Sequence, residues 1–429
     1  MRVLVVGANG FIGSAVVTEL HKADHKSRCV VRNAAQLDRR FPGVDAISLD
    51  LTSQDALDEE HWCRLLEDID AVVYVAGVLQ PLKPRVAWNV HCHAPEALYG
   101  ACEKQSVRRV IHVSATGVTE TDNTYSRSKL AGEEALKKKD LDWTILRPVL
   151  VIGDGSYGGT SMIRALAINP ILTPVIGDGS IPLGIIHKNE LATGIVNLLE
   201  TNSGVKTTLE PSCSEEMSMS DVVRSYRSWF GLPKRPILKI PLWLAGVLGK
   251  LGDLFQLDPI NSTAVAQFRG KMTGNAAQFE EVTGVKVSNL PEILVTRPSE
   301  SQDLWHARLF LLRPVIRMSL ALFWLMSGVS GLYFTLLIHQ LDLAQFVTSE
   351  LVPLSIVLMS SVKLAIGLVV LLGWNLRLMA WVQFIVVLGF AVLQGLVEPS
   401  SWMDPSAALF KDICLLVLIL VHRVVEQAR

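Results

Sequence analysis

The sequence predicts an α/β domain, a Rossmann-type doubly wound parallel sheet with a small substrate lobe, followed by an all-α four-helix transmembrane bundle. Short β-branched runs alternate with helical stretches from the first residues onward, which is the pattern of a parallel sheet covered by helices. From Pro314 the composition changes to long apolar stretches, and the mean hydropathy of +0.35 is high for a wholly soluble chain. We expect the α/β domain in residues 1–300 (substrate lobe roughly 150–300), a linker in 301–313 and the bundle in 314–425.

The charge balance and the cysteines restrict the class of protein. Lysine plus arginine total 40 against 41 for aspartate plus glutamate, so nothing calls for a nucleic-acid partner. The six cysteines contain no CxxC pair, which favours free thiols in a reducing compartment. No basic region and no cleavable signal precede "MRVLVV". In "VHCHA", His91 and His93 are two apart and diverge on a helix, so no metal site is predicted.

The first strand and the glycine-rich turn after it predict a dinucleotide site. "RVLVV" at 2–6 is a buried strand, "GANGFIG" follows, and a helix comes next. Glycines permit a tight turn and close approach of a pyrophosphate, and the helix N-terminus supplies free N–H groups. The alternative is a plain strand–turn–helix. The expected cofactor-binding residues of this turn are Gly7, Asn9, Gly10, Phe11, Ile12 and Gly13.

The residue after the second strand, "SRCVV", selects the nucleotide. An acidic residue there would bind a ribose 2′-hydroxyl, whereas Arg32 accommodates a 2′-phosphate, so NADP(H) is favoured over NAD(H). A solvated surface arginine is the alternative. Ligands bind at the carboxyl ends of parallel strands. The residues expected there after the third, fourth, fifth and sixth strands are Asp50 and Leu51, Ala76 and Gly77, Ser114, and Pro148.

"TYSRSKLAGEE" places Tyr125 and Lys129 four residues apart, on one helix face. A free tyrosine has a pKa of about 10, and a nearby cation favours the phenolate. Proton transfer by tyrosine would match hydride transfer by a nicotinamide cofactor. The alternative is an ordinary surface pair on a scaffold helix.

"GANGFIG", "HVSATG", "YSRSK" and "WTILRP" together resemble the short-chain dehydrogenase/reductase superfamily, over roughly the first 290 residues. Atypical or extended members are most similar, namely the NmrA-like proteins and the nucleotide-binding accessory subunit of respiratory complex I. The resemblance implies that Tyr125 is the general acid/base, that Lys129 holds the nicotinamide ribose and lowers the tyrosine pKa, and that Ser114 orients the substrate oxygen. It also implies that Asn89 supports a proton relay. Many extended members have a longer segment between serine and tyrosine than "ATGVTETDNT", and some atypical relatives bind nucleotide without catalysis.

The expected substrate lobe contains two repeated turns and one amphipathic helix. "VIGDGS" occurs at Val151–Ser156 and at Val175–Ser180, each time as a turn after an apolar strand. "IPLWLAGVLGKLGDLF" places Leu244, Leu248 and Leu251 on one helix face, with Phe255. Packing against the core is favoured, and lying on a membrane surface is the alternative.

Four apolar stretches predict the membrane bundle: Pro314–Ile338, Leu351–Leu372, Leu376–Val397 and Pro405–Val424. Arg308, Arg313 and Arg317 lie at the start of the first stretch, Arg377 follows the second, and Arg423 and Arg429 lie at the end of the fourth. The first and third connecting loops contain no lysine or arginine, so both termini are expected in the cytoplasm. The Rossmann domain would then be cytoplasmic, at the inner membrane if the source is bacterial. "LLRPVIRMSLALFWLMSG" and "FKDICLLVLIL" resemble the DoxX-like membrane domains, which gives no defined chemistry.

Ionisable residues lie inside these stretches, with Asp404 and Pro405 expected at the start of the last helix. A charge in hydrocarbon is costly, so we expect Lys363 to pair with Asp412, and Lys411 to point toward the outer interface. The alternative is that Lys363 reaches alone into a polar cavity.

Three functions fit the sequence. The first is a membrane-anchored NADP(H)-dependent oxidoreductase acting on a hydrophobic or membrane-derived carbonyl or hydroxyl compound. The second is a non-catalytic NADPH-binding assembly, regulatory or redox-sensing protein. The third makes the bundle a quinone or small-molecule site coupled to the reductase domain. All three involve the lipid bilayer, and none involves nucleic acid.

Overall fold

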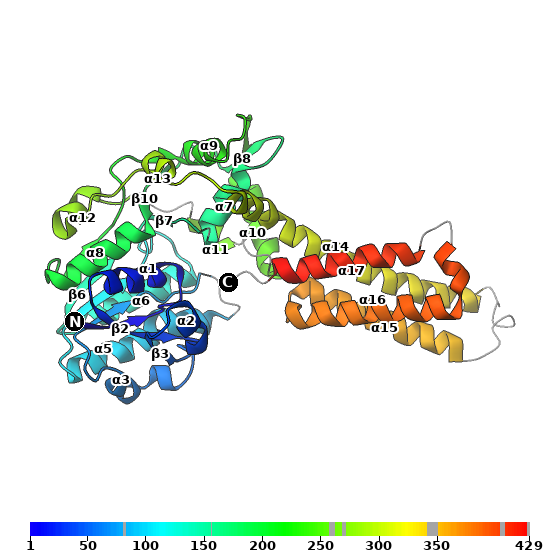
Figure 1. Ribbon diagram of the computed structural model, residues 1–429, viewed down its shortest axis with the longest axis horizontal. Helices are drawn as coiled ribbons and strands as arrows, with labels where there is room; N and C mark the ends of the chain where they lie inside the picture. The colour runs from blue at the N-terminus through cyan, green and yellow to red at the C-terminus, as the bar shows by residue number, and fades with distance from the viewer. Residues whose placement is uncertain are drawn as a thin grey trace. The chain divides into compact units, whose positions relative to one another are not determined.

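The computed structural model describes residues 1–79, 83–155, 157–256, 262–267, 272–340, 351–403 and 408–426 (Figure 1). It forms two compact units: Met1–Gly249 with Ser262–Leu304, and Lys250–Asn261 with Trp305–Arg429. The expected N-cap Asp404 and the expected first helical residue Pro405 lie outside the described residues, as does Ser156 of the first "VIGDGS" turn.

A seven-stranded parallel sheet forms the centre of the first unit, with the strand order β11-β6-β5-β4-β1-β2-β3. The order reverses at β1, next to β4, which is the switch point where doubly wound sheets bind ligands. The predicted fold class is confirmed. The strands are β1 Arg2–Val6, β2 Lys26–Val31, β3 Asp45–Ser48, β4 Ala71–Tyr74, β5 Arg109–Val113, β6 Asp142–Leu146 and β11 Thr207–Leu209.

Apolar helix faces cover the sheet. On one face a buried cluster joins strand residues such as Val72 and Val110 to Trp62, Leu98 and Leu136 of three helices. Elsewhere in this unit α1 packs against α8. The helices along the sheet are α1 Phe11–Lys22, α2 Ala34–Arg40, α3 Glu59–Leu65, α4 Pro84–Trp88, α5 Ala94–Lys104, α6 Thr124–Lys137 and α8 Lys188–Glu200, with a π-helical turn at Asn89–His93.

Short strand pairs build the rest of the first unit. β7 (Leu150–Ile152) pairs in parallel with β10 (Ile185–His187), β8 (Thr173–Ile176) in parallel with β13 (Ile237–Ile240), and β9 (Pro182–Leu183) antiparallel with β12 (Met217–Ser218). Each "VIGDGS" motif begins with the last two residues of an apolar strand, β7 or β8, and its glycine and aspartate residues come directly after that strand. The accompanying helices are α7 Gly158–Ala167, α9 Met219–Trp229, α10 Leu242–Phe255, α11 Ser262–Gln267, α12 Ala276–Thr283 and α13 Leu290–Thr296.

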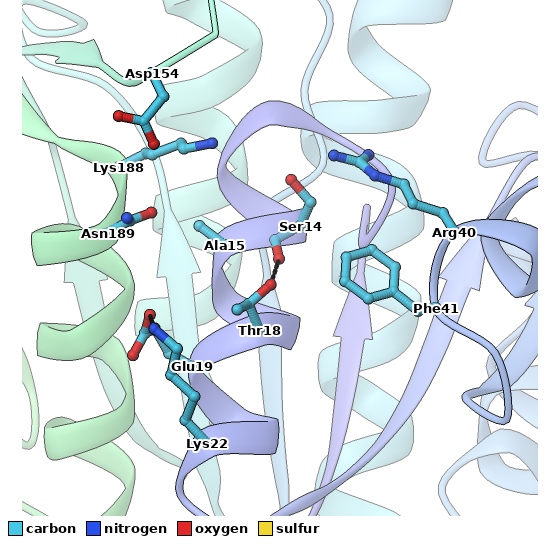
Figure 2. A pocket seen from close by; sticks show the side chains of 10 residues that line it. All are labelled: Ser14, Ala15, Thr18, Glu19, Lys22, Arg40, Phe41, Asp154, Lys188 and Asn189. Atoms are coloured by element: carbon cyan, nitrogen blue, oxygen red, sulfur yellow. Dashed lines mark hydrogen bonds and ion pairs between the residues drawn. The ribbon is translucent and has the colours of Figure 1, made fainter. Parts of the chain in front are cut away.

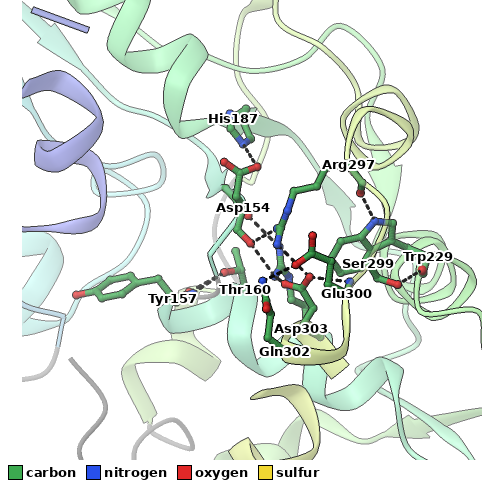
Figure 3. Close-up of polar contacts among 12 residues, drawn as sticks. Asp154, Tyr157, Thr160, His187, Trp229, Arg297, Ser299, Glu300, Gln302 and Asp303 are labelled. Atoms are coloured by element: carbon green, nitrogen blue, oxygen red, sulfur yellow. Dashed lines mark hydrogen bonds and ion pairs between the residues drawn. The ribbon is translucent and has the colours of Figure 1, made fainter. Parts of the chain in front are cut away.

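A buried polar cluster fixes the last residues of the first unit. Asp303 lies 3.5 Å from Arg164 and 3.1 Å from Arg297, and its side chain is almost fully buried. Figure 3 shows Arg297 reaching toward Asp154, whose carbonyl oxygen accepts a 2.5 Å hydrogen bond from the Arg297 guanidinium. The Trp229 indole N–H donates to the Arg297 carbonyl oxygen at 2.6 Å. Because the Asp303 carboxylate is buried and pairs with two arginines, these contacts fix residues 297–303 against the lobe.

The second unit contains helices α14 Ser301–Gln340, α15 Leu351–Leu372, α16 Leu376–Val397 and α17 Ala408–Val425. In the described residues, three helical segments are long and apolar enough to cross a membrane: Ser301–Thr335, Leu354–Leu372 and Leu376–Val397. The fourth predicted span is also a helix, but its 18 residues carry Lys411, Asp412 and Arg423. Residues 301–313, expected as a linker, are helical because α14 continues through Pro314.

The expected ion pair inside the bundle was wrong. Among the described residues no ion pair joins Lys363 to Asp412, and the Lys363 ammonium lies 5.5 Å from the centre of the Phe390 ring. α16 packs against both α15 and α17, so an aromatic ring of α16 is the neighbour of the Lys363 cation. One buried polar contact of this bundle is made by the Trp324 indole N–H, which donates to the Gln383 side-chain oxygen at 2.9 Å.

Candidate active site

The glycine turn after β1 has the tight geometry that the sequence predicts. Gly7 has a φ of +93°, and a Cβ there would lie 2.8 Å from the backbone nitrogen of Ala76. A Cβ on Gly13 would overlap the Gly7 carbonyl oxygen and would lie 2.9 Å from the Ala8 Cα. Only glycine therefore allows α1 to begin this close to the ends of β1 and β4.

The N-terminus of α1 is suited to a phosphate group. Its N-cap is Gly10, which offers no side-chain acceptor, and the first turn holds no acidic residue. The first-turn N–H groups and the positive end of the helix dipole are therefore available to a pyrophosphate. The Phe11 ring stacks on Tyr157, with centroids 5.3 Å apart, and Lys188 Nζ lies 5.4 Å from the Phe11 centroid. Ile12 is half-buried beside it.

A cavity of about 220 Å³ lies beside α1 (Figure 2). Figure 2 shows Arg40 near the start of this helix, and its guanidinium donates to the Asn9 side-chain oxygen at 3.1 Å. Arg40 and Lys188 could not be found from the sequence, because each lies far along the chain from the residue of the glycine turn that it contacts. The lining residues are Ser14, Ala15, Thr18, Glu19, Lys22, Arg40, Phe41, Asp154, Lys188 and Asn189.

Three residues expected to bind the adenosine part of the cofactor follow β2 and β3. Arg32 directly follows β2, and its exposed side chain has no hydrogen-bond or ion-pair partner in the described part of the chain. The Asp50 carboxylate accepts bonds from the N–H and the hydroxyl of Thr52, both at 2.9 Å, so it stabilises its own turn. Leu51 packs against the core cluster.

A buried serine and the ammonium of a buried lysine from α6 lie at the carboxyl end of β5. Ser114 is 4% exposed, and its hydroxyl has no hydrogen-bond partner among the described residues. Lys129 Nζ donates to the Val113 carbonyl oxygen at 3.0 Å and would lie 3.4 Å from a Cβ on Gly77. A buried hydroxyl without a partner is unusual in proteins, and this one follows β5 at the edge of the sheet where parallel sheets bind ligands. Pro148 is buried beside it and accepts a 3.1 Å bond from the Thr116 N–H.

The tyrosine and lysine stand on the first turns of α6, as predicted. Asn123 caps this helix by accepting the Ser126 N–H at 2.9 Å. Lys129 was expected to lower the pKa of Tyr125, but burial raises it to about 12 instead, so the hydroxyl is protonated at neutral pH. Burial lowers the pKa of Lys129 to about 8, and the Glu133 carboxylate partly opposes this effect. Lys129 is therefore mainly protonated near neutral pH and close to its titration range.

His91 is a member of the site that sequence reasoning did not find. Its Nε2 accepts the Val78 N–H at 3.0 Å, its Nδ1 lies 2.8 Å from the Ser128 hydroxyl, and its ring meets Tyr125 edge-on at 5.4 Å. Burial, with the nearby Lys129 charge, lowers its pKa to about 2, so the ring is neutral. His91 thus joins the end of β4 to the helix that carries Tyr125 and Lys129.

Asn89 has a different environment from the one the resemblance implies. It is buried at the start of the π-helical turn, and its side-chain amide donates to the Thr52 carbonyl oxygen at 3.5 Å. Within the described residues its side chain makes no hydrogen bond to Tyr125 or Lys129. His91, two residues later, is the side chain of this turn that reaches α6, through its contacts with Ser128 and with the Tyr125 ring.

Cys92, His93 and Glu96 bring one ligand atom each within 4.8 Å of one another, on and after the same turn. Burial raises the pKa of Cys92 to about 11, which opposes the thiolate that metal binding requires. No second feature of the described residues points to an ion at this position, and we assign it no metal.

Comparison with known proteins gives the class of each part. Residues 7–165 match a family model described as NAD(P)H-binding, and residues 321–420 match the DoxX-like family. The chain is 26% identical over 200 residues to "Ceramide reductase" of Caulobacter vibrioides, covering 46% of this chain and 61% of that protein. It is 29% identical over 247 residues to "Probable low-salt glycan biosynthesis reductase Agl14" of Haloferax volcanii, covering 52% and 77%.

Solved structures agree on the fold. "MoeE5 in complex with UDP-glucuronic acid and NAD" superposes with a TM-score of 0.52 at 22% identity, over 69% of this chain and 97% of that one. Another relative, an uncharacterized protein of Sinorhizobium fredii, is 24% identical over 212 residues, 45% of this chain and 52% of that protein. The chain thus spans about half to three-fifths of the length of these bacterial relatives.

The fold and the glycine turn define a Rossmann domain that binds a nicotinamide dinucleotide. The chain joins this N-terminal NAD(P)H-binding domain to a C-terminal DoxX-like domain, and its apolar helices make it a membrane-associated protein. These matches confirm an NAD(P)H-binding domain of Rossmann type and a DoxX-like domain, which is the coarse form of the two resemblances noted in the sequence.

Proposed function

We propose that this protein is a membrane-anchored, NADP(H)-preferring oxidoreductase that reduces the carbonyl group of a lipophilic or membrane-associated compound. The observation that carries the proposal is the buried hydroxyl of Ser114, which has no partner among the described residues and directly follows Val113, whose carbonyl oxygen accepts a bond from the Lys129 ammonium. An unpaired polar group in a dry site costs free energy unless a ligand completes it. Relatives named as reductases, one for a ceramide and one in glycan biosynthesis, support the reaction type and the lipophilic substrate class.

The residues of the site have complementary roles in this proposal. The first-turn N–H groups of α1 bind the pyrophosphate, and Lys129 bonds the nicotinamide ribose. Ser114 donates a hydrogen bond to the substrate oxygen, and Tyr125, which burial keeps protonated at neutral pH, gives that oxygen its proton. His91 orients the start of α6 through Ser128. A bound nicotinamide would supply the hydride.

Cofactor preference and orientation belong to the same proposal. Arg32 is exposed and free to meet a 2′-phosphate, which supports NADP(H) over NAD(H). The arginines at 308, 313, 317, 377 and 423 lie at one end of the predicted spans, which supports a cytoplasmic Rossmann domain and cytoplasmic termini.

A second candidate is a non-catalytic NADPH-binding regulatory or redox-sensing protein. It is favoured by one contact: the Lys129 ammonium bonds the Val113 carbonyl oxygen, whereas the proposed enzyme needs it near the tyrosine and the ribose. Full-length protein purified in detergent separates the two candidates. The enzyme should consume NADPH with at least one member of a panel of lipophilic ketones, aldehydes and quinones. Tight NADPH binding without consumption across the panel would favour the second candidate.

A further inference from the structure

Helix α10 (Leu242–Phe255) has its small residues buried and its large apolar residues exposed. Trp243 is 70% exposed and Leu254 is 61% exposed, whereas Ala245 is 5% exposed. Gly249 and Gly252 are buried next to Ala245 on the opposite side of the helix. A helix at the surface of a soluble domain turns its apolar stripe toward the core, so this stripe needs another apolar neighbour.

The exposed side chains form one continuous arc. At about 100° per residue, positions 243, 247, 251 and 254 fall within about 80° of the helix circumference, and 244, 248 and 255 fall within the next 60° or so. Of these residues, Trp243, Leu244, Val247, Leu248, Leu251 and Leu254 are exposed. The sequence alone favoured core packing for this stripe, and that interpretation was wrong.

The end of α10 lies at the polar end of the membrane helices. The Arg317 guanidinium donates to the carbonyl oxygens of Phe255 and Gln256 at 2.6 and 3.0 Å. It also donates to Val370 and Leu371, at the end of α15, at 2.9 and 2.7 Å. A Cβ on Gly373, in the turn after α15, would overlap this guanidinium.

The Arg317 contacts with the ends of α10 and α15 form a polar layer, and its position matches the boundary between hydrocarbon and water. The apolar run of α14 starts directly after Arg317 and extends to Ile338, a length of about 30 Å, which is the thickness of a bilayer core. Arg313 pairs with Glu426 at 3.0 Å, so the end of α17 lies in the same layer. α10 therefore ends at the depth of the lipid head groups.

The residues before and within α10 carry the charge that suits an anionic leaflet. From residue 232 to 252 there are four basic residues and no acidic one. Lys234, Arg235, Lys239 and Lys250 are exposed, and none forms an ion pair among the described residues. Trp243, exposed at the first turn of the helix, is a residue type that concentrates at membrane interfaces.

From these observations we propose that α10 lies in the head-group region of the bilayer, with its large apolar arc inserted and with residues 234–250 bound to anionic lipid. An amphipathic helix with exposed aromatic and leucine residues and a flanking basic segment binds membranes in this way. The anchor would hold the NAD(P)H-binding domain at the membrane surface, within reach of a lipophilic compound. It does not depend on whether the site turns over.

The test uses full-length protein in nanodiscs with and without anionic phospholipid. In a Cys414→Ser background, which removes the exposed thiol of the described residues, Leu248→Cys carries an environment-sensitive fluorophore on α10. Ile171→Cys, also exposed and apolar but off this helix, is the matched control. Lipids with a quencher near the head group should quench the label at 248 about threefold more than the label at 171, and iodide should quench mainly the control.

Three further measurements keep the result decisive. Val247→Cys replaces Leu248→Cys if the latter fails to fold. Lys234→Gln with Lys239→Gln should remove the dependence of the quenching on anionic lipid. Equal iodide quenching at 248 and 171 would overturn the proposal. So would protection at 248 that disappears in discs holding a single copy, because a second chain would then cover the arc.

Discussion

Replacing Glu133 with glutamine is expected to move the pH dependence of nucleotide binding toward acid. Glu133 is fully buried on α6, four residues after Lys129, and bonds Arg147 through Nε at 3.0 Å and through Nη2 at 2.5 Å. Its carboxylate opposes the burial that lowers the pKa of Lys129 to about 8. Glu133→Gln removes that opposition and leaves the Arg147 cation, so the pKa of Lys129 must fall further.

The expected fall in the pKa of Lys129 follows from the distance between its charge and that of Glu133. Charges about 6 Å apart at an effective dielectric constant of about 20 interact by about 2–3 kcal/mol. Allowing for relaxation, we expect a fall of about one pKa unit, or about 1.4 kcal/mol. Near pH 7.5 the protonated fraction of Lys129 would drop from about three-quarters to about one-quarter, so NADPH affinity should weaken about threefold there and little near pH 6.

The assay is a fluorescence titration of full-length protein with NADPH from about pH 6 to about pH 9. Glu134→Gln is the matched control, because Glu134 is half-exposed and pairs with Lys137 on the surface at 2.8 Å. Affinity of the wild-type protein should decrease with rising pH through the pKa of Lys129, and the midpoint of Glu133→Gln should lie about one unit lower. An unshifted midpoint, or an equal shift in the control, would refute the role of Lys129 as the titrating cation.

Three other outcomes are expected. Gly13→Ala forces a Cβ onto the Gly7 carbonyl oxygen, so NADPH binding measured by isothermal titration should weaken at least about tenfold. Gly155→Ala is the control, because a Cβ there meets open space, and it should leave binding unchanged. Equal loss in both variants would contradict the argument. Burial lowers the pKa of His91 to about 2 and that of His112 to about 3, below the value of 6.5 in the unfolded chain. The free energy of unfolding should therefore be highest above about pH 6.5. Below that pH it should fall by up to about 1.4 kcal/mol per pH unit for each ring. His112→Gln should flatten that slope in denaturant melts, and an unchanged slope would count against it. Arg32→Asp should reverse the preference for NADPH over NADH in paired titrations, and an unchanged ratio would exclude Arg32 as the determinant.

Much of the first unit could be predicted because its signals are local. The glycine turn, the strands before it and after it, and the helix of Tyr125 and Lys129 each occupy a few consecutive residues with a characteristic pattern. β11 was not predicted, since Thr207–Leu209 is a strand only through its pairing with β6, about 60 residues earlier.

The remaining differences have geometric causes. The π-helical turn at Asn89–His93 contains a wider turn than a regular helix, so the side chain that reaches α6 is His91 rather than Asn89. The rotation of each membrane helix is also absent from a single sequence, which is why Lys363 was paired with Asp412 rather than placed over Phe390. The sequence pattern of an apolar stripe on a helix is the same whether a protein core or a lipid surface covers the stripe, as α10 illustrates.

The most direct test of the proposed oxidoreductase compares the wild-type protein with Tyr125→Phe, using Tyr333→Phe as the control because Tyr333 lies on α14 outside the site. NADPH affinity and NADPH consumption with a lipophilic carbonyl compound are measured on the same preparations. The proposed roles predict equal NADPH affinity in all three, wild-type consumption in Tyr333→Phe, and a loss of at least about a hundredfold in Tyr125→Phe. Consumption by Tyr125→Phe at the wild-type rate would contradict the account.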